Sequence, residues 1–270
     1  MPSDYVLLCD KPAGITSHDV VASVRRTLAR KTRVGHAGTL DPFATGLLLV
    51  LVGRATRAQR FLMALRKRYE VTARFGATSS TGDPEGEIVE TGRVPDGALE
   101  LPTGLVRQRP PAYSAVKVGG RRAYELARRG EAVELAEREV HVHRFDEIWH
   151  RGDRRAFVIE CSSGTYVRSL IADLGDAYCE ALRRTRIGDF DVAQADPERP
   201  VDLSQALAFL PEVKLAGDEA RRAAHGARVE GAVAPAGAEI IRLTDAEGLI
   251  ALAQPVDDGS ALKPIVGFRQ

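Results

Sequence analysis

The spacing of hydrophobic residues near the N-terminus changes twice, and each spacing predicts a different element. The segment YVLLCDKP at 5–12 begins with apolar residues, ends at a proline and predicts a buried strand. Segment 14–30 carries valines and a leucine at the spacing of one helix face, with Thr16 or Ser17 placed to cap its start. The apolar run GLLLVLVG at 46–53 fits both a central strand and the start of a buried helix.

Later segments alternate between helical and strand-like periods. Residues 55–66 show a helical pattern, and residues 67–90 predict two strands joined by a turn rich in glycine, aspartate and proline. Residues 140–178 predict strand, turn, strand, tight turn and helix, with apolar and polar residues alternating in the middle. This order predicts an α+β fold in which a mixed, largely antiparallel sheet is flanked by helices.

A change in composition near residues 211–218 predicts a domain boundary. Beyond it the chain becomes rich in alanine and glycine and contains short strand-like pieces. The Pro-rich segment 193–202 is polar, but it need not separate domains. We therefore expect one large domain over residues 1–212 and a small β-rich module over residues 213–270.

The overall composition is that of an ordinary globular protein, with 44% hydrophobic and 28% charged residues in a chain of 270. No apolar run approaches the roughly 20 residues that span a bilayer, and the N-terminus lacks the features of a secretion signal. The cysteines Cys9, Cys161 and Cys179 show no CxxC spacing, which favours reduced thiols. We expect a cytoplasmic protein without membrane contact and, since no coiled coil or apolar seam is evident, a monomer.

Charge is segregated along the chain although the net charge is only +1. Residues 11–75 contain 13 Lys and Arg against 3 Asp and Glu, and residues 105–129 contain 7 basic residues against one acid. The stretch 83–100 between them has 6 acids against a single arginine. Genome-wide composition can explain an excess of arginine, but it does not explain this segregation, which indicates a phosphate-rich partner.

One carboxylate has an unusual setting. In GHAGTLDPFATGLL, Asp41 lies in a loop of small residues directly before a proline and a buried segment. Most aspartates before proline cap a turn, and the local residues alone do not exclude that role. Other positions favour chemistry: His36 in the same stretch, Tyr69 in the basic strand KRYEV, and Tyr166 and Arg168 in the turn SSGTYVRSL.

Together these stretches resemble the tRNA pseudouridine synthases of the TruB type. GHAGTLDPFATG matches the catalytic-loop motif of that family, and other motifs follow in the family's order: DKPAGITSHDVV at 10–21, KRYEV at 67–71, PPAYSAVKVGGRRAYELARRG at 110–130 and GTYVRSLIADLG at 164–175. The tail is similar, more weakly, to the RNA-binding PUA module of bacterial members. The resemblance implies a pseudouridine synthase domain over 1–212 and a PUA-like module over 213–270.

The implied reaction converts the uridine at position 55, in the TΨC loop of tRNA, to pseudouridine. The N1–C1′ glycosidic bond breaks, the uracil turns, and the base rejoins the sugar through C5. Bond breaking develops positive character at C1′, which an anion beside the sugar stabilises. The resemblance assigns this role to Asp41, with Arg168 as the partner that keeps it ionised. The sequence fits both attack by Asp41 on a sugar carbon and removal of the C2′ proton.

The resemblance also implies residues that bind RNA. The target uridine lies inside a folded loop, so it must be flipped out to react. Tyr69 matches the residue that stacks on the flipped uracil, and its hydroxyl could also move a proton. His36 matches a histidine that fills the gap left in the RNA. Tyr166 matches a residue at the uracil site, and Leu182 matches an apolar wall of the pocket.

The basic stretch 113–130 is interpreted as a mobile helix between glycine hinges that closes on RNA through Arg121 and Arg122. A solvated surface helix is the alternative. For Lys11 two interpretations remain open, a position near phosphate and a structural role. His141 and His143 share one strand face without acids at ligand spacing, so no metal site is expected. No nucleotide-binding glycine motif occurs, which suits an isomerisation without a cofactor.

Two rival functions use the same features. A non-catalytic tRNA-binding protein, acting as an RNA chaperone, would need the basic surface and the tail, but it would not need the set Asp41, Tyr69 and Arg168. A glycosidase or nucleoside hydrolase would need a second carboxylate near Asp41, and Asp10 and Asp19 offer no spacing argument for one.

Overall fold

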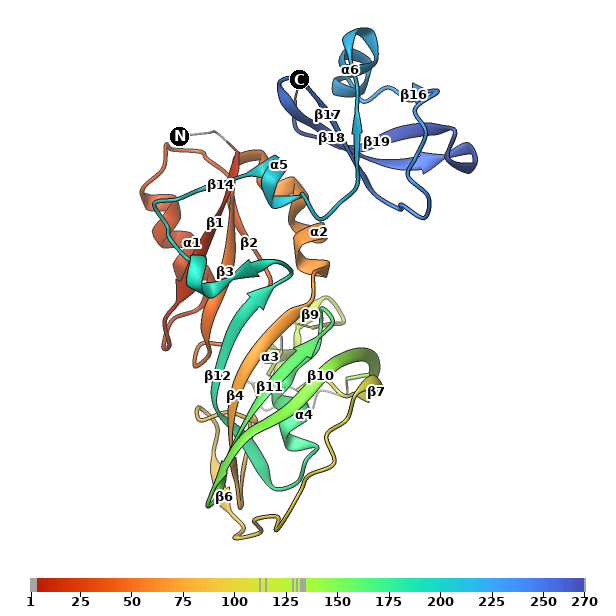
Figure 1. Cartoon of the computed structure of the whole chain (residues 1–270). Helices are drawn as coiled ribbons and strands as arrows, with labels where there is room; N and C mark the ends of the chain where they lie inside the picture. The colour runs from red at the N-terminus through yellow and green to blue at the C-terminus, as the bar shows by residue number, and fades with distance from the viewer. Residues whose placement is uncertain are drawn as a thin grey trace.

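The structure, a computed structural model, describes residues 4–111, 113–114, 116–127, 129, 131 and 135–269. Two sheets of different size dominate it (Figure 1). The large sheet is built from strands between residues 5 and 202, and the small sheet near the C-terminus lies at one end of it. In the part of the chain that is described, no helix is both long and apolar enough to cross a membrane.

Antiparallel pairs make up almost all of the large sheet, and only two of its described neighbours, β3 and β12, run parallel. The expected mixed, largely antiparallel sheet is thereby confirmed. In spatial order its strands are β14 (Val201–Asp202), β1 (Tyr5–Lys11), β3 (Thr45–Val52), β12 (Ala177–Ile187), β4 (Lys67–Phe75), β11 (Arg154–Cys161), β10 (Arg138–Arg151) and β7 (Gly104–Gln108), with β2 (Val34–Ala37) beside β3 and β13 (Phe190–Asp191) beside β12.

The apolar run at 46–53 forms the central strand β3, not the start of a helix. Both faces of this strand are covered, so every residue from Gly46 to Val52 is buried. One face packs against α1 (Ser17–Arg26), and the other packs against η1 (Gly53–Ala58), α2 (Gln59–Ala64) and α5 (Leu203–Ala206). A strand enclosed on both faces needs apolar side chains at successive positions, which explains the continuous run.

Helix α1 begins as the sequence predicts. The Thr16 hydroxyl accepts a hydrogen bond from the backbone N–H of Asp19 at 3.1 Å, and the Asp19 carboxylate accepts one from the N–H of Thr16 at 2.8 Å. This reciprocal pair satisfies two backbone donors that the helix leaves open at its start. Thr16 is therefore the cap, and the predicted helix is confirmed.

The prediction for residues 67–90 was incomplete. Strand β4 pairs with β11 and β12 in the middle of the large sheet, so it does not pair with the strand that follows the turn. The turn rich in glycine, aspartate and proline instead joins β5 (Ala77–Ser79) to β6 (Ile88–Glu90) in a separate hairpin. Alternation along β4 predicts a strand with one buried face, but it does not predict which strands lie beside it.

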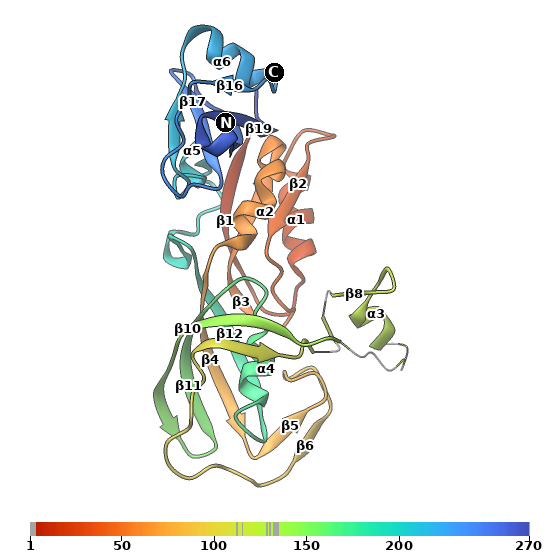
Figure 2. The ribbon, with the colours of Figure 1, turned by 90° about the vertical axis from the view of Figure 1, so that its right-hand side faces the viewer.

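A small unit near residue 120 stands away from the large sheet (Figure 2). Its described backbone contains the hairpin β8 (Lys117–Val118) and β9 (Arg121–Arg122), followed by the short helix α3 (Ala123–Ala127). Gly119 and Gly120 close the hairpin with φ angles of +57° and +84°, a region that glycine adopts readily. The expected basic helix between glycine hinges is therefore corrected, because Arg121 and Arg122 lie on a strand.

The small sheet shares a core cluster with the large one. Leu252 and Phe268 pack in the same cluster as Val6 of β1, and the Arg54 guanidinium donates a hydrogen bond to the Phe268 carbonyl at 2.6 Å. The predicted division at residue 212 stays a prediction. In spatial order, the strands of the small sheet are β15 (Glu212–Lys214), β17 (Ile241–Asp245), β18 (Gly248–Val256), β19 (Ala261–Gly267) and β16 (Val229–Glu230). The same part of the chain contains the helices α6 (Gly217–Ala224) and η3 (Asp257–Gly259). Earlier in the chain, the short helix η2 (Val192–Gln194) precedes β14.

The shared cluster predicts that a cavity in it destabilises the protein. Leu252 is fully buried, so Leu252→Ala should lower the free energy of unfolding by about 2–5 kcal/mol, measured by urea denaturation. Leu105 is 73% exposed on the edge strand β7, so Leu105→Ala is the matched control and should change stability by less than about 0.5 kcal/mol. Equal effects of the two substitutions would contradict the packing described here.

Candidate active site

Asp41 lies in the loop between β2 and β3, and the start of α1 holds this loop from one side. The Ser17 hydroxyl donates to the Leu40 carbonyl at 3.2 Å and accepts from the Leu40 N–H at 2.9 Å. The Gly14 N–H donates to the Pro42 carbonyl at 2.9 Å. The backbone on both sides of Asp41 is thus fixed by a neighbouring segment, so the carboxylate is presented from a rigid loop.

Lys11 binds the backbone of the same loop. Its side chain is fully buried, and its ammonium donates to the carbonyls of Pro12, Ile15 and Pro42 at 2.9, 2.8 and 3.1 Å. Burial lowers the pKa of Lys11, an effect that nearby Asp41 opposes. Its three donors are already used inside the protein, which fits the structural role, one of the two roles that the sequence leaves open for Lys11.

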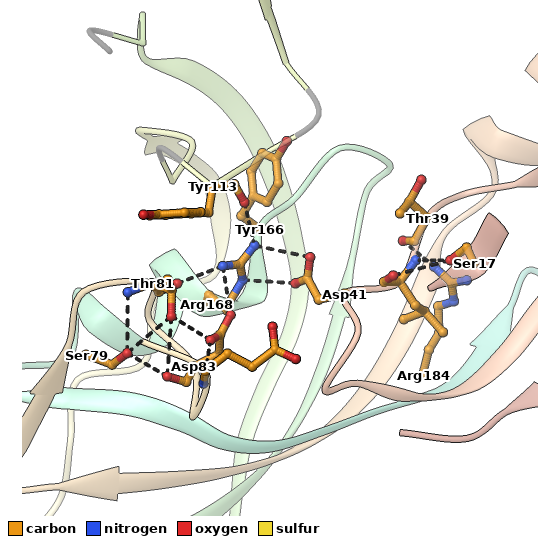
Figure 3. Close-up of polar contacts among 12 residues, drawn as sticks. Ser17, Thr39, Asp41, Ser79, Thr81, Asp83, Tyr113, Tyr166, Arg168 and Arg184 are labelled. Atoms are coloured by element: carbon orange, nitrogen blue, oxygen red, sulfur yellow. Dashed lines mark hydrogen bonds and ion pairs between the residues drawn. The ribbon is translucent and has the colours of Figure 1, made fainter. Parts of the chain in front are cut away.

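Arg168 reaches Asp41 from the other side (Figure 3). It lies in the first turn of helix α4 (Val167–Ala172), which packs on the core face of the large sheet. Its Nε lies 2.9 Å from Asp41 Oδ2, and its Nη2 donates to Asp41 Oδ1 at 3.2 Å. The Arg168 side chain is 3% exposed and the Asp41 side chain 33%, so the pair is open only on the carboxylate side. Two-point pairing of this kind fixes the plane of the carboxylate.

A second carboxylate, Asp83, binds the opposite edge of the same guanidinium. It lies in the loop between β5 and β6, and its Oδ2 is 3.0 Å from Arg168 Nη1. The carbonyls of Thr81 and Tyr113 accept from Nη1 and Nη2 at 2.7 and 3.0 Å. Arg168 is therefore surrounded by acceptors, with one carboxylate on each side.

Sequence reasoning missed Asp83, although a signal for it was present. The turn STGDPEG contains an Asp–Pro dipeptide, as does the Asp41 loop. The sequence predicts only a turn for this segment, and a turn is its local role: the Asp83 carboxylate also accepts from the Thr81 hydroxyl and from the Glu85 N–H at 3.1 Å. Only the fold shows that the turn meets α4.

The electrostatic setting of Asp41 combines opposing effects. Burial raises the pKa of the Asp41 carboxyl, the Arg168 cation lowers it, and the nearby Asp83 raises it again. The raised pKa means that the ionised form of Asp41 is less stable in the folded chain than in water. A carboxylate in this state interacts strongly with any positive charge that develops beside it.

Tyr69 and Leu182 form an apolar wall in the same region. They lie on the neighbouring strands β4 and β12, are 8% and 7% exposed, and pack in one cluster with Leu40 and Ala44 of the Asp41 loop. Burial raises the pKa of the Tyr69 phenol, and the cation of Arg184 opposes this shift. The structure thus brings together Asp41, Arg168, Tyr69 and Leu182 from four separate segments.

The other predicted residues lie around this group. Tyr166 immediately precedes α4, where its N–H and carbonyl both bond the Gln108 side chain at 2.7 Å, and the Arg138 guanidinium lies 4.6 Å from its ring centroid. His36 lies on β2 with its ring edge-on to His18 at 5.4 Å. Burial lowers the pKa of His36 to about 4, so the ring is neutral at neutral pH.

The predicted residue Arg121 of the outlying hairpin is not part of this group. Arg121 is exposed and pairs with Glu131 at 3.4 Å. The side chain of Arg122 lies outside the part of the chain that the structure describes, so its predicted RNA contact stays a prediction. Within that described part, no group of three or more His, Cys, Asp and Glu side chains could hold a metal ion.

The two carboxylates on Arg168 should affect stability in opposite directions. A carboxyl whose folded pKa is raised contributes stability below its unfolded pKa and loses it as the pH rises through the folded pKa. Asp41→Asn removes this loss, and Arg168 keeps Asp83 as its partner. We expect Asp41→Asn to resist urea better than wild type at pH 7, with the difference vanishing near pH 4.

Asp83→Asn provides the contrast for this comparison. It leaves a buried cation with one carboxylate fewer and disturbs the turn that Asp83 organises, so it should cost about 3–5 kcal/mol at pH 7. The same urea titrations measure both variants. A destabilisation of equal size for Asp41→Asn at pH 7 would show that the Asp41 charge is not held at a cost to folding.

Comparison with known proteins identifies the family to which this chain is similar. A model of the TruB family of pseudouridylate synthases, for the N-terminal domain, matches residues 25–167. A protein of Thermobifida fusca (strain YX) named tRNA pseudouridine synthase B is 46% identical over 256 residues, which cover 84% of this chain and 87% of that protein. A protein of the same name from Mycobacterium ulcerans (strain Agy99) is 42% identical and covers 98% of this chain and 94% of its own.

Solved structures share the fold at lower sequence identity. A chain in the structure of an H/ACA RNP bound to a substrate RNA containing 2′-deoxyuridine superposes with a TM-score of 0.71 at 22% identity, covering 98% of this chain and 85% of that one. A chain of a Cbf5–Nop10–Gar1 complex gives a TM-score of 0.69 at 23% identity. Because the relatives are similar over most of their length, this chain belongs to the TruB family of pseudouridine synthases.

Proposed function

We propose that this protein converts the uridine at position 55 in the T-arm of tRNA to pseudouridine, with Asp41 as the catalytic carboxylate. The observation that carries the proposal is the ion pair between Asp41 and the buried Arg168, at 2.9 Å, in a chain of the pseudouridine synthase family. The relatives named tRNA pseudouridine synthase B support tRNA as the substrate. A tRNA substrate also fits a reaction in the cytoplasm.

The geometry around Asp41 suits a reaction that passes through positive character at C1′. Arg168 favours the ionised form of the carboxylate, whereas burial opposes it. It also holds both carboxylate oxygens, so Asp41 needs little reorganisation when charge develops on the sugar. The same placement serves attack on a sugar carbon and removal of the C2′ proton.

The second carboxylate does not favour hydrolysis. A glycosidase uses one carboxyl as acid and another as base or nucleophile, so both must reach the substrate. The Asp83 side chain is 5% exposed, and its oxygens already accept from Arg168, Thr81 and the Glu85 N–H. Asp83 therefore acts as an ion-pair partner of Arg168, and Asp41 is the carboxylate of this pair that faces the open side of the site.

The apolar wall would receive the uracil once it is flipped out of the loop. Stacking on Tyr69 replaces the stacking that the base loses, and Leu182 closes the other side of the pocket. Tyr166 would contact the base from the start of α4, and His36, neutral at physiological pH, would fill the gap in the RNA. Neutral histidine can occupy a stacked site without carrying a charge into it.

The basic residues at 25–33 would meet the phosphates of the T-arm. This stretch contains Arg25, Arg26, Arg30, Lys31 and Arg33, all exposed and none in an ion pair that the structure describes. Arginines on the open face of the large sheet are instead paired, such as Arg154 with Glu180 at 2.8 Å. Unpaired cations beside His36 form the surface best suited to phosphate. The C-terminal sheet would add RNA contacts as a PUA-like module on a monomeric protein.

Conversion of an unmodified tRNA transcript, with the product mapped by position, tests the proposed function. Wild type should form pseudouridine at position 55, and Asp41→Asn should form none while binding tRNA nearly as well, since the amide keeps the shape and loses the charge. Turnover by Asp41→Asn within about tenfold of wild type would remove Asp41 from the chemistry. Binding and refolding of tRNA without any product from wild type would instead favour an RNA chaperone.

Substitutions at Tyr69 separate stacking from proton transfer. Tyr69→Phe keeps the ring and loses the hydroxyl, whereas Tyr69→Leu loses both. Stacking on an aromatic ring contributes about 1–3 kcal/mol per base, so Tyr69→Leu should weaken tRNA binding and abolish turnover. We expect Tyr69→Phe to bind tRNA but turn over poorly. Rates near wild type from Tyr69→Leu would leave Tyr69 with only a packing role.

A further inference from the structure

Among the residues that the structure describes, three arginines have almost fully buried side chains, and one of them has an unusual set of partners. Arg155 pairs with Glu147 at 3.1 Å, and Arg168 pairs with Asp41 and Asp83. Arg184 is 1% exposed but forms no ion pair with a carboxylate in the described part of the chain. A buried cation without an opposite charge is costly, so its hydrogen bonds must compensate.

The donors of Arg184 go to the loop that carries Asp41. Nη2 donates to the Gly38 carbonyl at 2.9 Å and Nη1 to the Thr39 carbonyl at 3.4 Å, both before Asp41. Nε donates to the Leu47 carbonyl at 2.8 Å, after Asp41. One guanidinium therefore links the two ends of the Asp41 loop.

The backbone of the loop is shaped for this contact. Gly46 has a φ of +106°, and a Cβ there would lie 2.2 Å from the backbone oxygen of Arg184. Only glycine permits the parallel strands β3 and β12 to approach so closely at this point. The close approach brings the Arg184 side chain within hydrogen-bonding distance of the carbonyls of the Asp41 loop.

Arg184 also contacts the second residue of the proposed site. It is the direct neighbour of Tyr69 across the β4–β12 ladder, so both buried side chains lie on the same face of the sheet. Burial raises the pKa of the Tyr69 phenol, and the Arg184 cation lowers it. The other charged or titratable groups near this hydroxyl are Cys161 on β11 and Asp41 itself.

We propose that Arg184 is a positioning residue that fixes the Tyr69 hydroxyl to the Asp41 loop. The Tyr69 phenol and the loop that carries the Asp41 carboxylate are then held by the same guanidinium. A flipped base that stacks on Tyr69 therefore also lies next to Asp41. This inference rests on the proposed function for its catalytic consequence. Its structural part, a hydroxyl held by a buried cation, can be measured without turnover.

The first test compares two buried arginines. Arg184→Lys keeps the charge but cannot span the loop carbonyls and the phenol, whereas Arg155→Lys makes the same change at a site that contacts Gly97, Pro95 and Glu147. Arg184→Lys should lower kcat for pseudouridine formation by about tenfold or more, with KM changed by less than about threefold. Arg155→Lys should leave both within about threefold.

A double-mutant cycle then shows whether Arg184 acts through Tyr69. In the Tyr69→Phe background, Arg184→Lys should lower kcat by less than about threefold, because the hydroxyl it positions is already gone. A loss as large as in the wild-type background, or no loss of kcat in either background, would overturn the proposal. A folded Arg184→Lys protein is verified by its urea transition.

An NMR measurement on wild type and Tyr69→Phe tests the proposal even if Arg184→Lys does not fold. The ¹⁵N signals of the Arg184 guanidinium report how fast its Nη groups exchange by rotation. They should exchange slowly in wild type and measurably faster in Tyr69→Phe, while those of Arg155 do not change. Identical exchange at Arg184 in both proteins would overturn the proposed contact, whereas absence of pseudouridine from wild type would overturn only the proposed function.

Discussion

The buried guanidinium of Arg168 is the interaction on which the candidate site depends. It is almost inaccessible to solvent and would be unstable there without opposite charge, so it requires carboxylates from elsewhere in the chain. Asp41 and Asp83 supply them from two loops that are distant in sequence. The β2–β3 loop, the β5–β6 loop and helix α4 are therefore held together by a single cation, and the orientation of the Asp41 carboxylate follows from this requirement.

The Asp41 loop is further fixed by buried cations that bind backbone carbonyls. Lys11 binds Pro42 from the end of β1, and Arg184 binds Gly38 and Leu47 from β12. Carbonyl oxygens in a loop have no regular backbone partners, so cationic side chains satisfy them where water is excluded. The loop is thus rigid without regular structure, as our proposal for Asp41 requires.

Arginine has two separate uses in this chain. On the open face of the large sheet it forms ion pairs that keep a polar surface neutral, as with Arg68 and Glu160 at 3.9 Å. In the stretch 25–33 the cations have no described carboxylate partners and remain available for phosphate. The same residue type therefore serves solubility in one region and, by our proposal, RNA binding in another. Net charge alone does not distinguish the two uses.

The sequence by itself determined the elements whose signals are local. The hydrophobic period gave α1 and the strands β1, β10 and β11, the Thr16–Asp19 pattern gave the helix cap, and the motif around Asp41 gave the family. These features depend on residues within a few positions of one another, so a linear pattern can record them.

Tertiary structure decided the partners of the buried polar groups. It placed β4 between β11 and β12, turned the expected basic helix near residue 120 into a hairpin and short helix, buried Lys11, and brought Asp83 to Arg168. Neither hydrophobic period nor turn composition states which distant acceptor will meet a buried cation. That choice follows from strand order and from the need to satisfy each charge that folding removes from water.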